Sequence, residues 1–192
     1  ILITVFLTLT TNLFAQSEQM IGVTAVVIGE VYNQNKEPLI SGSKIYFGDT
    51  VNVKENSNTQ ILLLDETVLT VGENSELIID EFIYDPATSI GKISTSILNG
   101  TVKVITGGIS AQNPDNLKVK VPTGVIGARG TEFAVIAKNG KSTVVLLGPG
   151  PNNQLGLIPG NISLSDGLNT MDLIQPGMAG VITNWKQLVK FL

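Results

Sequence analysis

The sequence is dominated by short runs of β-branched and aliphatic residues that are separated by glycine, asparagine, aspartate and proline. Representative runs are Val23–Ile28, Lys44–Phe47, Gln60–Leu64 and Thr101–Ile105. β-Branched side chains favour extended backbone, and short strands at roughly 8–12-residue spacing are typical of an all-β domain. Helical periodicity does not occur between these runs. The pattern therefore predicts an all-β domain over residues 20–183.

Two Asn-Gly dipeptides indicate tight turns within this pattern. Asn99-Gly100 and Asn139-Gly140 each stand between two β-rich runs. A type I′ turn needs a positive φ at both central residues, and asparagine and glycine are the residues that tolerate it best. We therefore expect each dipeptide to close an antiparallel hairpin.

The way in which the strands stack is less constrained. Several runs end in Gly-Asp or Asp-Glu and the next run starts at once, which favours strands that bend sharply into one another. We therefore expect a β-roll or solenoid-like stack of short strands. A strict short repeat is not visible in the sequence, and periodicity alone does not separate such a roll from a sandwich.

The C-terminal segment, residues 184–192, departs from the β pattern. Trp185, Leu188, Val189 and Leu192 follow the i, i+3, i+4, i+7 spacing of an amphipathic helix, and Asn184 can serve as its N-cap. We expect a short helix that covers the end of the sheet. The alternative is a helix that binds a partner.

The N-terminal segment is apolar or hydroxylic from Ile1 to Phe14 and is followed by Ala15 and Gln16. This pattern is typical of the hydrophobic core of a secretory signal peptide, which we expect to span residues 1–15, to lack its own start and to be cleaved after Ala15. The alternative is a membrane anchor, although the segment is shorter than the roughly 20 residues that span a bilayer. The processed chain is expected to be periplasmic or secreted from a bacterium, and not integral to a membrane.

Composition restricts the chemistry that the chain can perform. It contains neither histidine nor cysteine, so a histidine general base, a Ser-His-Asp triad, a Cys/His zinc site and a disulfide are all excluded. The net charge of −4 argues against a nucleic-acid partner, because such proteins carry a basic surface. We expect a protein without enzymatic activity and without a cofactor.

Carboxylates are concentrated between residues 65 and 85. Such a cluster could bind calcium or supply a pair of catalytic carboxylates. The spacing does not match an EF-hand, and alternation along a strand places neighbouring residues on opposite faces. We expect a solvated acidic rim without a metal site. The residues are Asp65, Glu66, Glu73, Glu76, Asp80, Glu81 and Asp85.

Motifs spread along most of the chain carry a resemblance to a known family. The most specific is Gly127-Ala-Arg-Gly-Thr-Glu-Phe133, which follows Val121-Pro-Thr. Further elements in the same order are Phe47-Gly-Asp-Thr-Val51, Leu64–Ser75, Leu98–Val102 and Ile174–Ala179. Together, over roughly residues 22–183, they resemble the FecR domain family. Glu66 is a departure, because the family usually has glycine at that position.

The resemblance implies both a fold and a role. The best-known members of the family are inner-membrane regulators, whose periplasmic part receives a signal from an outer-membrane transporter and passes it to a sigma factor. This chain resembles the periplasmic domain alone, without the anti-sigma region. The resemblance therefore implies an extracytoplasmic sensing module in signal transduction, with an outer-membrane receptor or a membrane regulator as its partner. The matching positions, expected to be structural, are Gly48, Asp49, Asp65, Gly127, Arg129, Gly130, Thr131 and Phe133.

Arg129 is the charged residue of the signature. Because it lies between glycines at an expected bend, we expect it to bind backbone carbonyl groups and to pair with Glu132, Asp80 or Asp65. The alternative is an exposed guanidinium that binds a carboxylate or phosphate of a partner.

Two functions follow from these observations. The first is a non-enzymatic module that makes protein–protein contacts in the cell envelope. The alternative is a structural or adhesion-type envelope scaffold that binds glycan or peptidoglycan. A hydrolase that uses the acidic cluster is a third and weaker interpretation.

Overall fold

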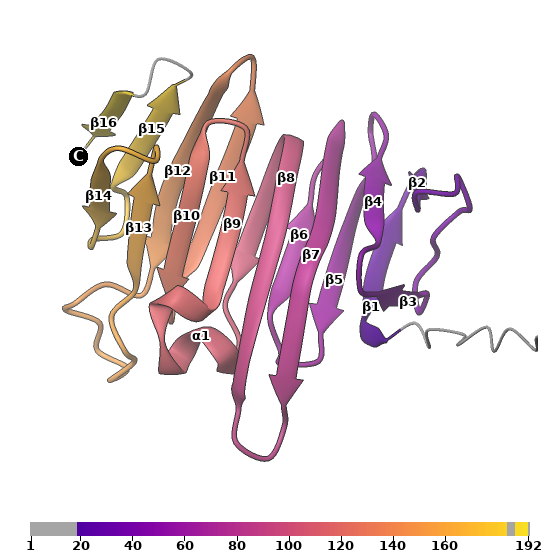
Figure 1. Cartoon of the computed structure of the whole chain (residues 1–192), viewed down its shortest axis with the longest axis horizontal. Coiled ribbons are helices and arrows are strands. Elements are labelled where there is room, and N and C mark those ends of the chain that lie inside the picture. The colour runs from indigo at the N-terminus through magenta and orange to yellow at the C-terminus, as the bar shows by residue number, and fades with distance from the viewer. Residues whose placement is uncertain (1–18, 184–186, 192) are drawn as a thin grey trace, which may run out of the picture.

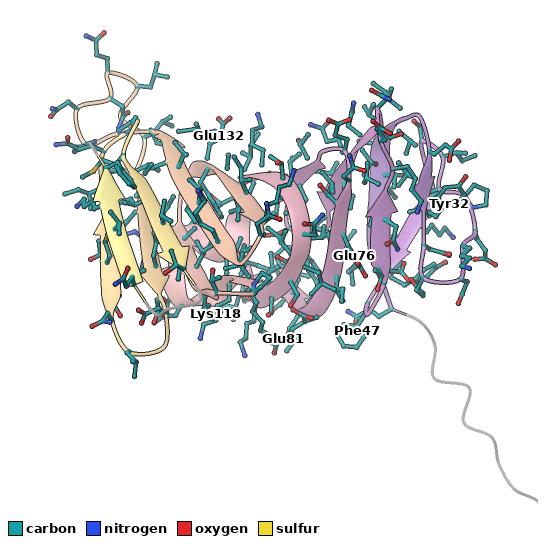
Figure 2. The ribbon with its side chains drawn as sticks, turned by 90° about the horizontal axis from the view of Figure 1, so that it is seen from above. Tyr32, Phe47, Glu76, Glu81, Lys118 and Glu132 are labelled. Atoms are coloured by element: carbon teal, nitrogen blue, oxygen red, sulfur yellow. The ribbon has the colours of Figure 1, made fainter. Side chains whose placement is uncertain are left out.

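The computed structural model describes residues 19–183 and 187–191. These residues form one 16-stranded sheet that is folded into two layers (Figures 1 and 2). One short α-helix and one 3₁₀ turn lie between the strands. The prediction of an all-β domain is therefore confirmed.

The two layers are called sheet A and sheet B. In spatial order, sheet A consists of β3 (Lys44–Tyr46), β1 (Met20–Ile28), β5 (Asn58–Leu63), β6 (Val68–Val71), β8 (Ile90–Ile105), β11 (Glu132–Lys138), β12 (Lys141–Gly148), β15 (Ala179–Thr183) and β16 (Gln187–Phe191). Sheet B consists of β2 (Val31–Tyr32), β4 (Thr50–Val53), β7 (Ser75–Asp85), β8, β9 (Leu117–Val121), β10 (Gly124–Arg129), β13 (Asn161–Ser165) and β14 (Thr170–Leu173).

Both layers advance along the long axis from the N-terminal strands at one end to the C-terminal strands at the other, in chain order except that β3 lies outside β1 (Figure 1). The sheet does not close on itself: β3 and β2 are the edges at one end, and β16 and β14 are the edges at the other. Within the described residues, β8 and β9 are the single parallel pair. The β-roll or solenoid prediction is not confirmed, because antiparallel neighbours in an open, two-layered sheet account for the observed pairing.

The long strand β8 joins the two layers. Its first part, up to Asn99, pairs with β7 in sheet B, and its last part, from Gly100, pairs with β6 and β11 in sheet A. The predicted hairpin at Asn99-Gly100 is therefore wrong. Gly100 has a φ of 102°, and a Cβ there would collide with Ser75. The glycine lets the strand cross between the layers in contact with β7 instead of turning back.

The second Asn-Gly prediction is confirmed. Asn139 and Gly140 join β11 to β12, and their φ angles are 53° and 67°. Both values are positive, as a type I′ turn requires. The two strands then remain paired over most of their length, from Lys138–Lys141 to Phe133–Leu146.

The core lies between the layers and is built from alternate residues of each strand. Ile61, Val104 and Val135 from sheet A and Ile79 and Leu164 from sheet B belong to this one core, and each is almost fully buried. This period of two follows from the pleat of the strand, which points successive side chains to opposite faces.

The connection from β8 to β9 fills one end of the sandwich. It contains α1 (Gly108–Gln112) and the 3₁₀ turn η1 (Pro114–Asn116). Ile109 of α1 is completely buried and belongs to the hydrophobic core. The helix therefore seals the opening between the layers near the ends of β8 and β10 (Figure 1).

The C-terminal segment does not form the expected helix in its described part. Residues 187–191 form β16, which pairs with β15 from Thr183–Gln187 to Ala179–Phe191. A helix of nine residues is marginal in water, whereas pairing satisfies the backbone donors and acceptors along the edge of β15. Residues 184–186 and 192 lie outside the described residues.

The expected signal peptide, residues 1–15, also lies outside the described residues. Among the residues that are described, no helix has the length and apolar character needed to cross a bilayer.

Candidate functional site

Asp65 of the family signature is buried at the turn between β5 and β6, with 1% of its surface exposed. Its carboxylate accepts hydrogen bonds from the Thr67 backbone N–H at 3.1 Å, the Thr67 hydroxyl at 2.8 Å and the Ile109 backbone N–H at 3.4 Å. The Asp65 carbonyl accepts a further bond from Gly108 N–H at 2.8 Å. Asp65 therefore fastens α1 to this turn.

Glu66 follows at the centre of the same turn. Its φ is 71°, in the left-handed region that glycine adopts without cost. This explains why glycine is usual at the position in similar sequences. The turn is therefore formed with glutamate in place of glycine, and the Glu66 backbone adopts the strained left-handed conformation.

Thr131 holds the other side of the β8 terminus. Its backbone N–H donates to the Thr106 hydroxyl at 2.8 Å, and its own hydroxyl donates to the Gly148 carbonyl at 2.7 Å. Gly107, which follows Thr106 in sequence, donates its N–H to the Thr67 hydroxyl at 3.0 Å. A series of hydrogen bonds therefore links the Asp65 turn, past the end of β8, to the signature block, which is the Gly127–Phe133 segment that carries the family motif.

The remaining residues of that block are also structural. Phe133 is completely buried in the core, and Gly127 lies within β10, opposite Ser163 of β13. Gly130 has a φ of 54° and faces Ile158 of the loop between β12 and β13. The block therefore forms the sharp passage from sheet B into sheet A.

Arg129 does not form the expected ion pair with any described residue. Glu132 pairs with Lys103 at 3.0 Å, and Asp80 bonds to the Ser96 hydroxyl at 2.7 Å and to Lys120 at 3.5 Å. The Nε of Arg129 is enclosed without a hydrogen-bond partner among the described residues. The expected pairing is wrong: each of the three expected carboxylates has another partner, Asp65 being bonded to Thr67 within its own turn.

Gly48 and Asp49 lie in a different part of the molecule, at the turn from β3 to β4. The Asp49 carboxylate accepts from the Tyr46 backbone N–H at 2.8 Å and from the Gln34 side-chain amide at 2.9 Å. Gly48 has a φ of 84° and donates its N–H to Ile79 at 3.1 Å. Asp49 thereby ties the loop after β2 to the start of β4.

The acidic cluster does not converge. Glu81 pairs with Lys92 at 3.0 Å, Glu73 accepts from the Asn56 backbone N–H at 2.8 Å, and Asp80 faces β9. Asp85 caps the β7–β8 turn, where hydrogen bonds from Thr88 and Ala87 lower its pKa. No group of three acidic residues within the described part of the chain could hold a metal ion.

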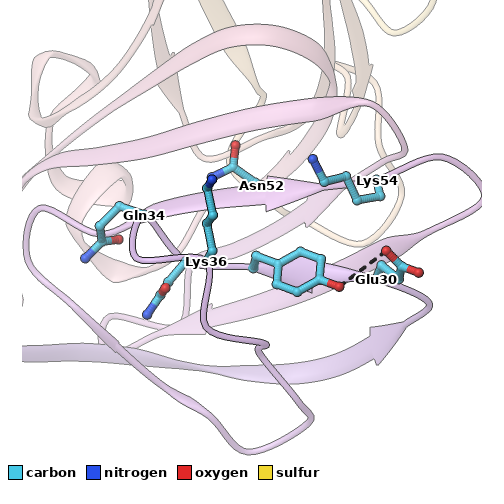
Figure 3. A pocket seen from close by; sticks show the side chains of 7 residues that line it. Glu30, Gln34, Lys36, Asn52 and Lys54 are labelled. Atoms are coloured by element: carbon cyan, nitrogen blue, oxygen red, sulfur yellow. Dashed lines mark hydrogen bonds between the residues drawn. The ribbon is translucent and has the colours of Figure 1, made fainter.

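A polar pocket of about 560 Å³ lies at the N-terminal end of the molecule. Its lining residues come from β2, the loop after β2, and β4 (Figure 3): Glu30, Tyr32, Asn33, Gln34, Lys36, Asn52 and Lys54. The Tyr32 hydroxyl donates to Glu30 at 3.3 Å. The negative charge of Glu30 raises the pKa of this tyrosine.

The two outer faces of the sandwich differ in chemistry. In sheet B, strands β9 and β13 alternate cleanly, as in Leu117-Lys-Val-Lys-Val121 and Asn161-Ile-Ser-Leu-Ser165, and point lysine and serine outward, while Val125 of β10 and Ile83 of β7 are also exposed. One register row across this face contains Lys118, Gly127 and Ser163. This pattern is typical of a sheet with one face in water.

Sheet A has apolar side chains on its outer face as well as in the core. Ile136, Leu147 and Val189 are each more than 40% exposed, and Phe191 is 52% exposed. Register places Val145, Ala179 and Phe191 in one row across three strands, so these side chains adjoin. The outer face of sheet A is defined here by Val26, Leu62, Ile105, Ile136, Val145, Leu147, Val181, Val189 and Phe191.

The two faces point in opposite directions (Figure 2). Glu132 lies on the side of sheet A, and Lys118 and Glu81 lie on the side of sheet B. The charges on the outer face of sheet A include the Lys103–Glu132 pair and, beside the β11–β12 turn, the exposed Lys138 and Lys141. Exposed apolar side chains gathered on one face mark interaction sites in proteins.

Sequence reasoning missed both the pocket and this outer face. The signal for the face was present, because Ile61–Leu64 and Val144–Leu147 are continuous apolar runs where alternation is expected. Such runs are typical of strands that are covered on both faces. The pocket left no comparable signal, since its residues meet only through the pairing of β2 with β4.

These features define a class of protein: an open, two-layered β domain whose signature residues fix turns and whose outer face is apolar. The family model described as FecR protein matches residues 49–148, just over half of the 192 residues. The chain therefore belongs to the FecR family, as its motifs indicated.

Solved structures support the fold. Two crystal structures of a candidate anti-sigma factor from Parabacteroides distasonis ATCC 8503 resemble the chain with TM-scores of 0.53 and 0.52, at 14% sequence identity. The similarity covers 74% of this chain and 58% of each of those chains, so this chain matches little more than half of their length. No curated protein sequence matches the chain.

Proposed function

We propose that this protein is a non-enzymatic sensing module of the bacterial envelope that acts through protein–protein contacts. Membership of the FecR family and the similarity to a candidate anti-sigma factor support a regulatory role. The outer-membrane receptor or membrane regulator named by the family resemblance remains the proposed partner, and the proposed location is periplasmic or secreted.

The observation that carries this proposal is the apolar outer face of sheet A. Nothing in the described residues covers it, although Ile136, Leu147 and Val189 are each more than 40% exposed. Burial of apolar surface supplies about 25 cal/mol per Å², so a partner that covers these side chains gains binding free energy. The partner surface is expected to be apolar at its centre, with a charged pair opposite Lys103 and Glu132.

The experiment is a comparative pull-down from bacterial envelope extract, with residues 16–192 as bait. Ile136→Glu places a carboxylate on the outer face of sheet A, between Thr101 and Thr143 of the neighbouring strands. Ser163→Glu places the same charge on the outer face of sheet B and serves as the matched control. We expect a specific membrane protein to be captured by the wild type and the control but not by Ile136→Glu, with all three baits equally folded by circular dichroism.

Capture that is unaffected by Ile136→Glu would contradict the proposed surface. Recovery of a second copy of the bait in place of another protein would contradict the proposed partner.

A scaffold that binds glycan or peptidoglycan is the second candidate function. The observation that favours it is the polar pocket, which presents amide, hydroxyl and ammonium groups but no aliphatic side chain. Co-sedimentation with purified cell wall tests it. Binding to the wall without a specific protein prey would favour the scaffold over the sensing module.

A further inference from the structure

The polar pocket lies at the opposite end of the molecule from the C-terminal part of the outer face of sheet A (Figures 1 and 2). We infer that this pocket binds a sugar acid, with the carboxylate held between the ammonium groups of Lys36 and Lys54. The inference rests on the second candidate function, for which it names a ligand class, and it does not depend on the protein partner proposed for sheet A.

The loop that forms one wall of the pocket is held in place by its own side chains. The Asn33 side-chain oxygen accepts from the backbone N–H groups of Asn35 and Glu37, each at 3.0 Å, and its amide donates to the Glu37 carboxylate at 2.8 Å. The Asn33 backbone N–H donates to the Glu37 carbonyl at 3.0 Å, and its carbonyl accepts from the Lys36 N–H at 3.1 Å, so five hydrogen bonds fix Asn33 in the loop. A wall that is ordered before binding lowers the entropic cost of holding a ligand.

Gln34 fixes the same loop against the sheet. Its amide donates to Asp49 at 2.9 Å, and its side-chain oxygen accepts from the Thr50 backbone N–H at 3.0 Å. The signature residue Asp49 thus positions the loop that carries Lys36. The side-chain donors and acceptors of Asn33 and Gln34 are occupied by hydrogen bonds within the protein, so we do not expect these two residues to be the main ligand contacts.

The pocket side chains that are not occupied by hydrogen bonds within the protein are mostly hydrogen-bond donors. The ammonium groups of Lys36 and Lys54 form neither an ion pair nor a hydrogen bond with a described residue, and no described residue bonds to the Asn52 amide. Asn52 and Lys54 are two residues apart on an extended segment and share a face. Figure 3 shows Asn52 between Lys36 and Lys54. Two cations beside an amide suit a carboxylate, because charge-assisted hydrogen bonds are the stronger ones.

Tyr32 and Glu30, on the other side of the pocket, indicate which class of carboxylic acid fits. Its lining contains the Tyr32 ring and the Glu30 carboxylate but no aliphatic side chain, so it does not match a fatty acid or an apolar peptide. Glu30 can accept hydrogen bonds from hydroxyl groups, and an aromatic ring packs against the C–H face of a sugar. The volume of about 560 Å³ lies within the roughly 300–1,000 Å³ range of small-molecule sites. A hydroxylated acid therefore fits better than the alternatives.

The test is calorimetric titration of the full chain with trigalacturonate, with neutral galactotriose and with the tripeptide Glu-Glu-Glu, all at the same ionic strength. We expect trigalacturonate to bind, and to bind about tenfold more weakly to the double variant Lys36→Gln/Lys54→Gln, because two partly exposed charge contacts together amount to about one decade of affinity. Lys118→Gln, which removes an exposed lysine from the outer face of sheet B, should bind like the wild type.

Equal binding of galactotriose would overturn the role of the carboxylate, and equal or tighter binding of the tripeptide would overturn the assignment to a sugar. Unchanged affinity in the double variant, or no binding of trigalacturonate to the wild type, would overturn the site. Ile136→Glu should bind trigalacturonate normally. Loss of partner capture in that variant together with intact sugar binding therefore separates this inference from the protein contacts of sheet A.

Discussion

Removal of the Asp65 carboxylate should be among the most destabilising single changes at the signature positions. In Asp65→Ala, the Thr67 N–H, the Thr67 hydroxyl and the Ile109 N–H lose their acceptor in a site that is 1% exposed. A buried donor left without a partner costs about 1–3 kcal/mol. The Thr67 hydroxyl can rotate and the 3.4 Å bond to Ile109 is weak, so we expect a total loss of about 3 kcal/mol in the free energy of unfolding.

The assay is urea unfolding followed by far-UV circular dichroism. Asp65→Asn keeps the size of the side chain and one acceptor oxygen, and is expected to lose about 1–2 kcal/mol. Glu55→Ala, which truncates an exposed carboxylate, should lie within about 0.5 kcal/mol of the wild type. A double-mutant cycle with Thr67→Val should give a coupling of about 1 kcal/mol or more, since the two side chains share one hydrogen bond.

The reasoning would be refuted if Asp65→Ala unfolded at the same urea concentration as Glu55→Ala. It would also be refuted if the cycle showed no coupling, because Asp65 would then stabilise the turn by some route other than Thr67.

Further predictions concern turns and pH. Glu66→Gly should raise the free energy of unfolding by up to about 1 kcal/mol, because it relieves a φ of 71° and loses part of that gain to unfolded-state entropy, whereas Glu66→Ala should bring no gain in a thermal melt. Gly100→Ala should cost at least about 2 kcal/mol more than Gly42→Ala, since both residues have positive φ but a Cβ collides with a neighbour at Gly100 alone; equal melting temperatures would contradict this. The pKa of Asp85 is lowered from 3.8 by its bonds to Thr88 and Ala87, so its stabilising contribution is complete above about pH 4 and is lost as the pH falls through the lowered value; an NMR titration of Asp85 in the wild type and in Thr88→Ala should show the pKa rise in the variant.

Much of the fold could be predicted from local patterns. The alternation in β9 and β13 sets both the strand and its inward face, because the pleat has a period of two. Asn139-Gly140 identified its turn because both residues accept positive φ. In these places the sequence carries the structural information within a few residues.

Other features depended on residues that are distant in sequence. Gly100 has the positive φ of a turn, yet it sits in a strand that crosses between layers against Ser75. The apolar spacing of residues 187–191 is compatible with either a helix or a strand. They form a strand because they pair with the otherwise unpaired edge of β15. Of the carboxylates expected to pair with Arg129, Glu132 pairs with Lys103 and Asp80 pairs with Lys120, and both lysines are distant in sequence. Asp65 instead bonds to Thr67, two residues further along the same turn.

The candidate sites also include residues that local motifs identify and residues that only the strand pairing brings into a site. Asp65 and Asp49 were identified from motifs, and the structure gives them roles at turns. The apolar run Val144–Leu147 was visible in the sequence, but its outward half could be recognised as exposed only after β11, β12 and β15 were paired.

The outer face of sheet A as a partner-binding surface is the central claim, and site-specific photo-crosslinking in living bacteria tests it most directly. A photoreactive amino acid is placed at Ile136 on sheet A or at Ser163 on sheet B. The claim predicts an adduct with another envelope protein from position 136 and none from position 163. An adduct from position 163 alone, or an adduct of two copies of this chain from position 136, would contradict it.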